Sequence, residues 1–319
     1  MKAINRDKVD TWKHDIEKSV DFYNEWFRAF ASATYRNARL LARNQVENVL
    51  AVTNGVCDLT AATLVFSPQT LPALRQMTCP PLARDRLAGL SGIPPSTVKW
   101  IESHNRPPSR SAGNMLSAAE KIVPVLKGMF DTDLLPWLNV PNARPTPEQR
   151  SRAALVVADR LCGSLADSII RNAQEKRQLD AMAAWLCRKG YRKASPGSFP
   201  QMKPGEFAFH LNVNVKVAKG SESRINNPVD VVIQPLSAKQ GDVPIFIEAK
   251  SAGDFANVNK RRKEEAQKAQ QLQLTYGNEV RFLLFLCGYF DNGYLGYEAA
   301  EGIDWIWEHR ISDMEHLGL

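Results

Sequence analysis

Two acidic residues and one lysine stand beside two short apolar segments in the second half of the chain. Asp230 directly precedes the apolar run at residues 231–233, while Glu248 and Lys250 follow the run at residues 245–247. If the two runs form neighbouring strands, the three charged groups meet at one edge of a sheet. Glu248 and Lys250 then share a face, because alternate side chains of a strand point the same way. This pattern is typical of a site that holds Mg²⁺ against a phosphate, and it indicates a metal-dependent nuclease.

Phosphodiester hydrolysis requires an activated water, neutralised non-bridging oxygens and a stabilised leaving oxygen, and a divalent cation contributes to each. Asp230 and Glu248 supply two carboxylate ligands for Mg²⁺, and the carbonyl oxygen of Ala249 is a candidate third ligand. We expect Lys250 to orient the attacking water or to balance the charge of the phosphate. The alternative is an ordinary hairpin that carries a surface ion pair.

Hydrophobic periodicity predicts the elements that position these residues. A helix is expected over residues 146–189, and strands over 207–217, 229–236 and 243–249. A helix over 257–276, a strand over 280–287 and a last helix that includes 303–316 follow. The order predicts an α/β fold, with a mixed sheet that has helices on its faces.

A proline-rich segment at residues 141–147 divides the chain. Thr146, Pro147 and Gln149 then form a capping-box pattern that starts a helix. Helical periodicity dominates before this break, which predicts an N-terminal all-α domain over residues 1–140 for DNA recognition or dimerisation. The catalytic domain is expected over residues 146–319.

Further charged residues fall on elements that flank the predicted site. Glu175 lies on the helix before the strands and is a candidate fourth catalytic residue, although a solvated carboxylate is an equal alternative. His210 lies in the first strand, where a packed or exposed histidine is favoured over a site residue. Four cations begin the helix over 257–276 and are candidates to follow the DNA backbone, or else to pair with glutamates on a solvated face: Lys260, Arg261, Arg262 and Lys263.

Residues 83–102 have the pattern of a helix-turn-helix, with an apolar first segment, a turn at Gly92 and a second apolar segment. In that motif the second helix enters the major groove, which makes Thr97 and Lys99 candidate DNA contacts. The alternative is a helical hairpin with no role in DNA binding.

Composition limits the class of protein. The 319 residues are 44% hydrophobic and 24% charged, with a formal net charge of +7, which fits a globular protein with a polyanionic partner such as DNA. No apolar run is long enough to span a membrane, and the polar start lacks a signal-peptide core, so a cytoplasmic protein is expected. Five scattered cysteines without a C-x-x-C pair argue against a disulfide framework or a structural zinc site.

Four segments together resemble the XamI family of type II restriction endonucleases, within the PD-(D/E)xK nuclease superfamily. They are residues 172–178, 227–230, 247–253 and 259–265. The resemblance covers residues 146–319 best. It implies Mg²⁺-dependent cleavage of double-stranded DNA at a short palindrome, for which the family suggests GTCGAC, by a homodimer. It also implies that Asp230, Glu248 and Lys250 are catalytic, with Glu175 as a further acid. Val229 separates Pro228 from Asp230, so the strict Pro-Asp pair of the superfamily is absent.

Two other functions remain open from the residues alone. One is a non-catalytic DNA-binding regulator that uses residues 83–102. The other is a repair nuclease that selects DNA structure rather than sequence. A cleavage assay with Lys250→Ala separates these functions from restriction.

Overall fold

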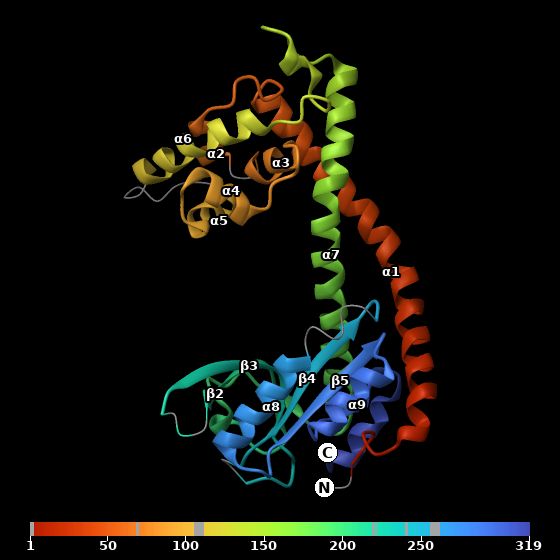
Figure 1. Ribbon diagram of the computed structural model, residues 1–319. Coiled ribbons are helices and arrows are strands. Elements are labelled where there is room, and N and C mark those ends of the chain that lie inside the picture. The colour runs from red at the N-terminus through yellow and green to blue at the C-terminus, as the bar shows by residue number, and fades with distance from the viewer. Residues whose placement is uncertain are drawn as a thin grey trace. The chain divides into compact units, whose positions relative to one another are not determined.

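A computed structural model describes residues 3–67, 70–104, 112–218, 220, 222–239, 242–255 and 262–319 (Figure 1). The chain forms two compact units. The sheet unit comprises Met1–Phe30 and Arg171–Leu319, and the helical unit comprises Ala31–Ile170. Two long helices, α1 (Val9–Val52) and α7 (Pro147–Arg188), contribute residues to both units. This division differs from a boundary at residues 141–147, since the first 30 residues group with the sheet.

Helices build the described part of the helical unit around one apolar core. Besides parts of α1 and α7, it contains α2 (Ala61–Phe66), α3 (Thr70–Gln76), α4 (Arg84–Ser91), α5 (Pro95–Ser103), α6 (Ala112–Met129) and the 3₁₀ helix η1 (Pro136–Asn139). Leu64, Leu74 and Ile122 are fully buried members of this core. Within the described residues of this unit, β pairing is limited to one isolated bridge between Thr78 and Phe130.

A six-stranded mixed sheet forms the centre of the other unit. Its strands are β1 (Arg192–Lys193), β2 (Glu206–Lys216), β3 (Arg224–Ile233), β4 (Ile245–Ala252), β5 (Arg281–Gly288) and β6 (Asp304–Trp307). They lie side by side in chain order. The β2–β3 and β3–β4 pairs are antiparallel, whereas β1–β2, β4–β5 and β5–β6 are parallel. The expected α/β class with a mixed sheet is therefore confirmed.

The sheet separates two apolar cores. Phe246 and Leu284 pack with α8 (Arg262–Tyr276) and α9 (Asn292–Ala300) on one face. Ile247 and Phe285 pack with the C-terminal part of α7, and with η4 (Glu308–Leu317), on the other face. Because both faces are covered, the central strands are almost continuously apolar, as buried strands require.

The start of α7 follows its sequence signal closely. Gln149 donates its backbone N–H to Thr146 Oγ1 at 3.2 Å, and its side-chain oxygen accepts the N–H of Thr146 at 2.9 Å. The expected capping box is thus formed. The helix ends at Arg188, and Gly190 takes a φ of 88°, a backbone conformation that glycine adopts without strain.

The expected helix over residues 303–316 is wrong. Residues 304–307 form strand β6, and the 3₁₀ segment η4 follows. Trp305 and Trp307 are both fully buried. A short run that is buried on both faces shows no hydrophobic periodicity, so the sequence does not distinguish a strand from a helix there. Asp304 also accepts the backbone N–H groups of Ile4 and Asn5, which places the N-terminal segment against the sheet.

Candidate active site

Strands β3 and β4 separate at the position where the acidic residues lie. Their ladder runs only from the Ile233–Ile245 pair to the Val231–Ile247 pair. Beyond the ladder, the side chain of Asp230 takes the place of a backbone hydrogen-bond acceptor, since its Oδ2 accepts the N–H of Ala249 at 2.9 Å. The two expected strands thus meet as the sequence indicated, and an opening begins between them beside Asp230.

Glu248 and Lys250 both lie on the face that α8 covers. The side chain of Glu248 is 5% exposed, and its Oε2 lies 3.6 Å from Lys250 Nζ. Its other oxygen lies 2.7 Å from the Nζ of Lys268, on α8. Lys268 also donates to the carbonyl of Pro228 at 2.7 Å, which places this ammonium between β3 and β4.

Glu265, one turn before Lys268 on α8, is the partner of Lys250. Its Oε1 lies 3.0 Å from Lys250 Nζ, and its side chain is 2% exposed. Sequence reasoning missed both Glu265 and Lys268. Their spacing of three residues places them on one side of α8, but the same spacing is typical of solvated charge pairs. Only the packing of α8 on the sheet shows that they point inward.

Electrostatics oppose ionisation of Glu248 and favour the charged form of Lys250. Burial raises the pKa of Glu248, and the neighbouring carboxylate of Asp230 raises it further, while Lys268 and Lys250 partly offset both effects. Burial lowers the pKa of Lys250, but the carboxylates of Glu265 and Glu248 outweigh this effect and raise its pKa overall. An ammonium group whose charged form is favoured is therefore held beside a carboxyl group whose charged form is disfavoured.

The alternation of β2 and β3 changes face at the pair His210 and Asp230. In the β2–β3 register these two residues stand opposite each other, between the Phe209–Val231 and Leu211–Val229 pairs. Val231 packs on the α7 side of the sheet, whereas Leu211 and Val229 pack on the α8 side. His210 takes a φ of 52°, which is uncommon for a residue with a side chain.

The change of face breaks the alternation that a regular strand would have. Phe209 packs with the core on the α7 side, whereas Leu211, Val213 and Val215 pack on the α8 side. It also gives Asp230 its position. The residue lies where the pleat reverses, so its carboxylate is close to Ala249 on β4 and also to side chains on the α7 side.

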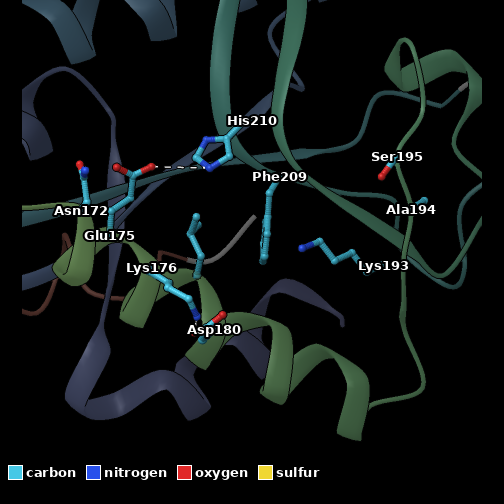
Figure 2. Close-up of a pocket in the computed structure, with 10 residues that line it drawn as sticks. Asn172, Glu175, Lys176, Asp180, Lys193, Ala194, Ser195, Phe209 and His210 are labelled. Carbon is cyan, nitrogen blue, oxygen red and sulfur yellow. Dashed lines mark hydrogen bonds and ion pairs between the residues drawn. The ribbon is translucent and has the colours of Figure 1, made fainter. Parts of the chain in front are cut away.

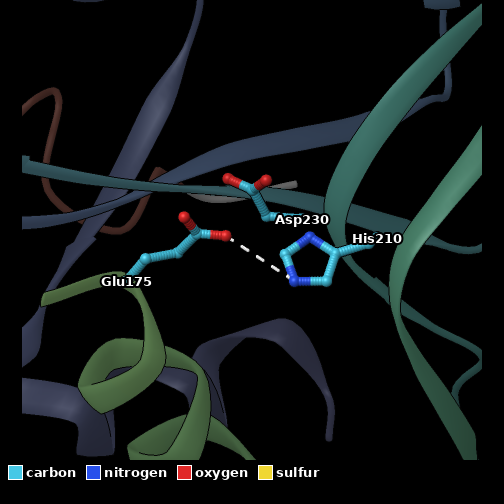
Figure 3. A group of neighbouring side chains, drawn as sticks. All are labelled: Glu175, His210 and Asp230. Atoms are coloured by element: carbon cyan, nitrogen blue, oxygen red, sulfur yellow. Dashed lines mark ion pairs between the residues drawn. The ribbon is translucent and has the colours of Figure 1, made fainter. Parts of the chain in front are cut away.

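Glu175 and His210 meet Asp230 from two other elements. Ligand atoms of the three side chains all lie within 4.8 Å of one another (Figure 3). Glu175 Oε1, on α7, lies 3.6 Å from His210 Nε2. The two residues line a pocket of about 710 Å³ together with Asn172, Lys193 and Phe209 (Figure 2). Glu175, the candidate further acid, therefore lies beside Asp230 with an exposed side chain. His210 is exposed, as one of its two expected states, and it lies beside both acids.

The candidate DNA contacts that the structure describes lie on two helices. Helices α4 and α5 flank a left-handed Gly92, as a helix-turn-helix pattern requires, and Lys99 is exposed on α5 while Thr97 is half-buried. Lys263 is exposed near the start of α8. Lys260, Arg261 and the side chain of Arg262 lie outside the described residues. Across the described parts of the chain, no helix is both long and apolar enough to cross a membrane.

Comparison with known proteins identifies the family. A family model described as XamI restriction endonuclease matches residues 54–307. The type II restriction enzyme SalI from Streptomyces albus G is 49% identical over 320 residues, which cover 99% of each protein. A crystal structure of protein VC1899 from Vibrio cholerae aligns over 86% of this chain, with 13% identity and a TM-score of 0.26. This chain spans 55% of that protein, and a similarity this low carries no argument about the fold.

The resemblance drawn from the sequence is thus confirmed by two matches. One covers most of the chain, and the other extends over nearly its full length. The chain belongs to the XamI restriction endonuclease family and is a type II restriction endonuclease that acts on DNA.

Proposed function

We propose that this restriction endonuclease hydrolyses duplex DNA with Asp230, Glu248 and Lys250, on a sheet of the PD-(D/E)xK type. The observation that carries the proposal is the 2.9 Å hydrogen bond from the Ala249 N–H to Asp230 Oδ2. It fixes the carboxylate of Asp230 beside the backbone that joins Glu248 to Lys250. Two acids from neighbouring strands and one lysine thereby share a single opening in the sheet.

The oxygens that line this opening fit a hard divalent cation. Type II restriction endonucleases generally use divalent metal ions, and Mg²⁺ prefers carboxylate and carbonyl oxygens. The N–H and C=O groups of one strand residue point to the same side, as paired residues of an antiparallel ladder require. Because the N–H of Ala249 points at Asp230, its carbonyl oxygen faces the same opening. We infer that Asp230, Glu248 and the Ala249 carbonyl hold Mg²⁺.

Each residue then has a defined task. When bound, Mg²⁺ stabilises negative charge on the phosphate and lowers the pKa of a water molecule. Asp230 and Glu248 would hold the cation, and the carboxylate of Glu248 would then no longer pair with the ammonium of Lys268. Lys250 keeps its proton, since Glu265 and Glu248 raise its pKa. Its ammonium donates to the phosphate or to the attacking water, whose position it fixes.

In this proposal, other parts of the chain select the DNA sequence that is cleaved. Thr97 and Lys99, on the second helix of the α4–α5 pair, contact DNA in the groove, and Lys263 follows the phosphate backbone together with the cations before it. The helical unit, which holds most of residues 1–140, serves recognition or dimerisation in this proposal, and the sheet unit, which holds most of residues 146–319, serves catalysis. A palindrome such as GTCGAC requires a two-fold protein, so we propose a homodimer with one active site per subunit.

Plasmid digestion tests the proposal. Wild-type protein with Mg²⁺ is expected to give discrete fragments, and chelation with EDTA is expected to abolish them. Lys250→Ala should lower the cleavage rate by a factor on the order of 10² or more, with DNA binding retained. Lys189→Ala, at an exposed ion pair with Glu315, is the matched control and should cut normally.

The same assay distinguishes the alternatives. Binding without cleavage in both proteins indicates a regulator, and cleavage of branched or damaged DNA alone indicates a repair nuclease. Fragments that persist with Lys250→Ala contradict the assigned site.

A further inference from the structure

We propose that Glu175, His210 and Asp230 form a second divalent-cation site, which takes a transition metal such as Mn²⁺ or Co²⁺ through a histidine nitrogen. The site rests on the proposed function only in sharing Asp230 with the Mg²⁺ site. Its new element is the imidazole of His210, which adds a nitrogen to an otherwise oxygen-only centre (Figure 3).

The spacing of the three ligand atoms suits a common ion. Metals hold carboxylate oxygens and imidazole nitrogens at about 2.0–2.2 Å, so two ligands of one ion lie up to about 4.3 Å apart. Glu175 Oε1 and His210 Nε2 are 3.6 Å apart, and all three ligand atoms lie within 4.8 Å. The side chains of Glu175 and His210 are 47% and 56% exposed, which leaves them free to move the remaining few tenths of an ångström.

The local charge balance calls for a cation. Four carboxylates gather at this centre, and the two ammonium groups that contact them, those of Lys250 and Lys268, pair with Glu248 or Glu265. The carboxylates are those of Glu175, Asp230, Glu248 and Glu265. Among the described residues, neither a lysine nor an arginine forms an ion pair with Glu175 or Asp230. Two negative charges are therefore left facing one another, and one divalent cation neutralises two.

The backbone at His210 adopts an uncommon conformation that brings its side chain to this position. A φ of 52° is uncommon for histidine, and the ladder between β2 and β3 is interrupted at this residue. The result is an imidazole beside Asp230, at the reversal of the pleat, where it also reaches Glu175 on α7. An imidazole favours metals such as Mn²⁺, Co²⁺ and Zn²⁺ over Mg²⁺, which prefers oxygen ligands. The imidazole nitrogen of His210 therefore predicts that this site prefers such metals over Mg²⁺.

The site is open to solvent. Glu175 and His210 point toward each other at the edge of a pocket of about 710 Å³, with Asn172 and Lys193 also on its wall (Figure 2). That space admits a hydrated ion and a phosphate oxygen together. Because Asp230 is a ligand in both proposals, it joins two cation sites of different ligand chemistry.

Pulsed electron paramagnetic resonance on bound Mn²⁺ tests the proposal without relying on cleavage. Full-length protein at neutral pH is loaded with Mn²⁺, and the echo modulation of a directly bound ¹⁴N nucleus is recorded. Wild-type protein is expected to show this modulation. His210→Asn should lack it, and asparagine is the suitable replacement because it tolerates a positive φ. His316→Ala, at an exposed histidine, is the matched control and should keep the modulation.

Calorimetry gives a second readout on the same proteins. His210→Asn should weaken Mn²⁺ binding by about tenfold or more, the least expected from losing a ligand, and should leave Mg²⁺ binding nearly unchanged. Circular dichroism of each variant confirms that it folds. Wild-type protein without ¹⁴N modulation, or modulation that persists in His210→Asn, overturns the proposal.

The Glu248→Gln variant separates this inference from the proposed function. It should lose Mg²⁺-dependent cleavage and keep the ¹⁴N modulation. If cleavage survives in Glu248→Gln, the proposed Mg²⁺ site fails while the nitrogen-containing site stands. If cleavage is lost as expected and no nitrogen modulation appears in wild-type protein, only the second site fails.

Discussion

The ammonium of Lys268 lies 2.7 Å from Glu248 Oε1 and also donates to the carbonyl of Pro228. It neutralises the carboxylate to which we assign Mg²⁺, so cation binding has to displace it. We expect Lys268→Met to tighten Mg²⁺ binding by roughly tenfold, because an ion pair of about 1.4 kcal/mol no longer has to be broken. Isothermal titration at pH 8 measures the change, and Lys189→Met is the control. Unchanged or weaker Mg²⁺ binding in Lys268→Met contradicts competition between the two cations.

The raised pKa of Glu248 makes stability depend on pH. Its pKa in the folded protein lies above the ordinary value of 4.5, so folding favours the protonated form. The stabilising contribution is complete below pH 4.5 and is lost as the pH rises through the raised pKa, by about 1.4 kcal/mol for each unit of difference.

Urea unfolding in EDTA, at several pH values, measures this effect against Glu248→Gln. The stability of wild-type protein relative to the variant should fall as the pH rises from 4.5, and Mg²⁺ should reduce that fall. A difference between the two proteins that stays constant with pH, or increases, shows that Glu248 does not titrate as its surroundings require.

Glu265 and Lys250 form a buried pair whose members depend on each other. We expect Glu265→Ala to destabilise the protein by about 3 kcal/mol, the lower end of the range for breaking a buried pair, since Glu248 still faces the ammonium at 3.6 Å. Lys250→Met together with Glu265→Ala should cost less than the sum of the single changes, by about 1 kcal/mol or more. Denaturant midpoints of the four proteins test this, and strict additivity would show that the pair is not coupled.

Lys99 tests the role of α5 in DNA binding. Its side chain is exposed on the second helix of the α4–α5 pair. If it contacts a phosphate, Lys99→Ala should weaken binding similarly for all sequences and reduce the slope of log affinity against log salt by about one. Lys127→Ala, exposed at the end of α6, is the control. Equal salt slopes for Lys99→Ala and wild-type protein place Lys99 away from the DNA.

The pairing of the two acidic strands was predictable from the sequence. Apolar runs at 231–233 and 245–247 are short enough only for strands, and both are fully buried in the ladder of β3 and β4. The capping box at Thr146 and Gln149 was predictable for the same reason, since its signal lies entirely in neighbouring residues. At both places the sequence pattern predicted the structure, because interactions between neighbouring residues determine it.

The reversal of the pleat at His210 was not predictable. It depends on a positive φ at a residue other than glycine, which no local pattern signals. The inward direction of Glu265 and Lys268 was hidden for a different reason. Charges at helical spacing look the same on a solvated face as on a face packed against a sheet. In both cases tertiary contacts, rather than the order of residues, determine the outcome.

The most direct test of the account is a crystal structure with Ca²⁺ and a duplex that contains the cleavage site, since Ca²⁺ accepts the same oxygen ligands as Mg²⁺. We expect a calcium ion bound by Asp230, Glu248 and the carbonyl of Ala249, with Lys268 moved away from Glu248 and Lys250 beside the scissile phosphate. An ion bound elsewhere, with Lys268 still 2.7 Å from Glu248, would contradict the assignment of these residues as the catalytic centre.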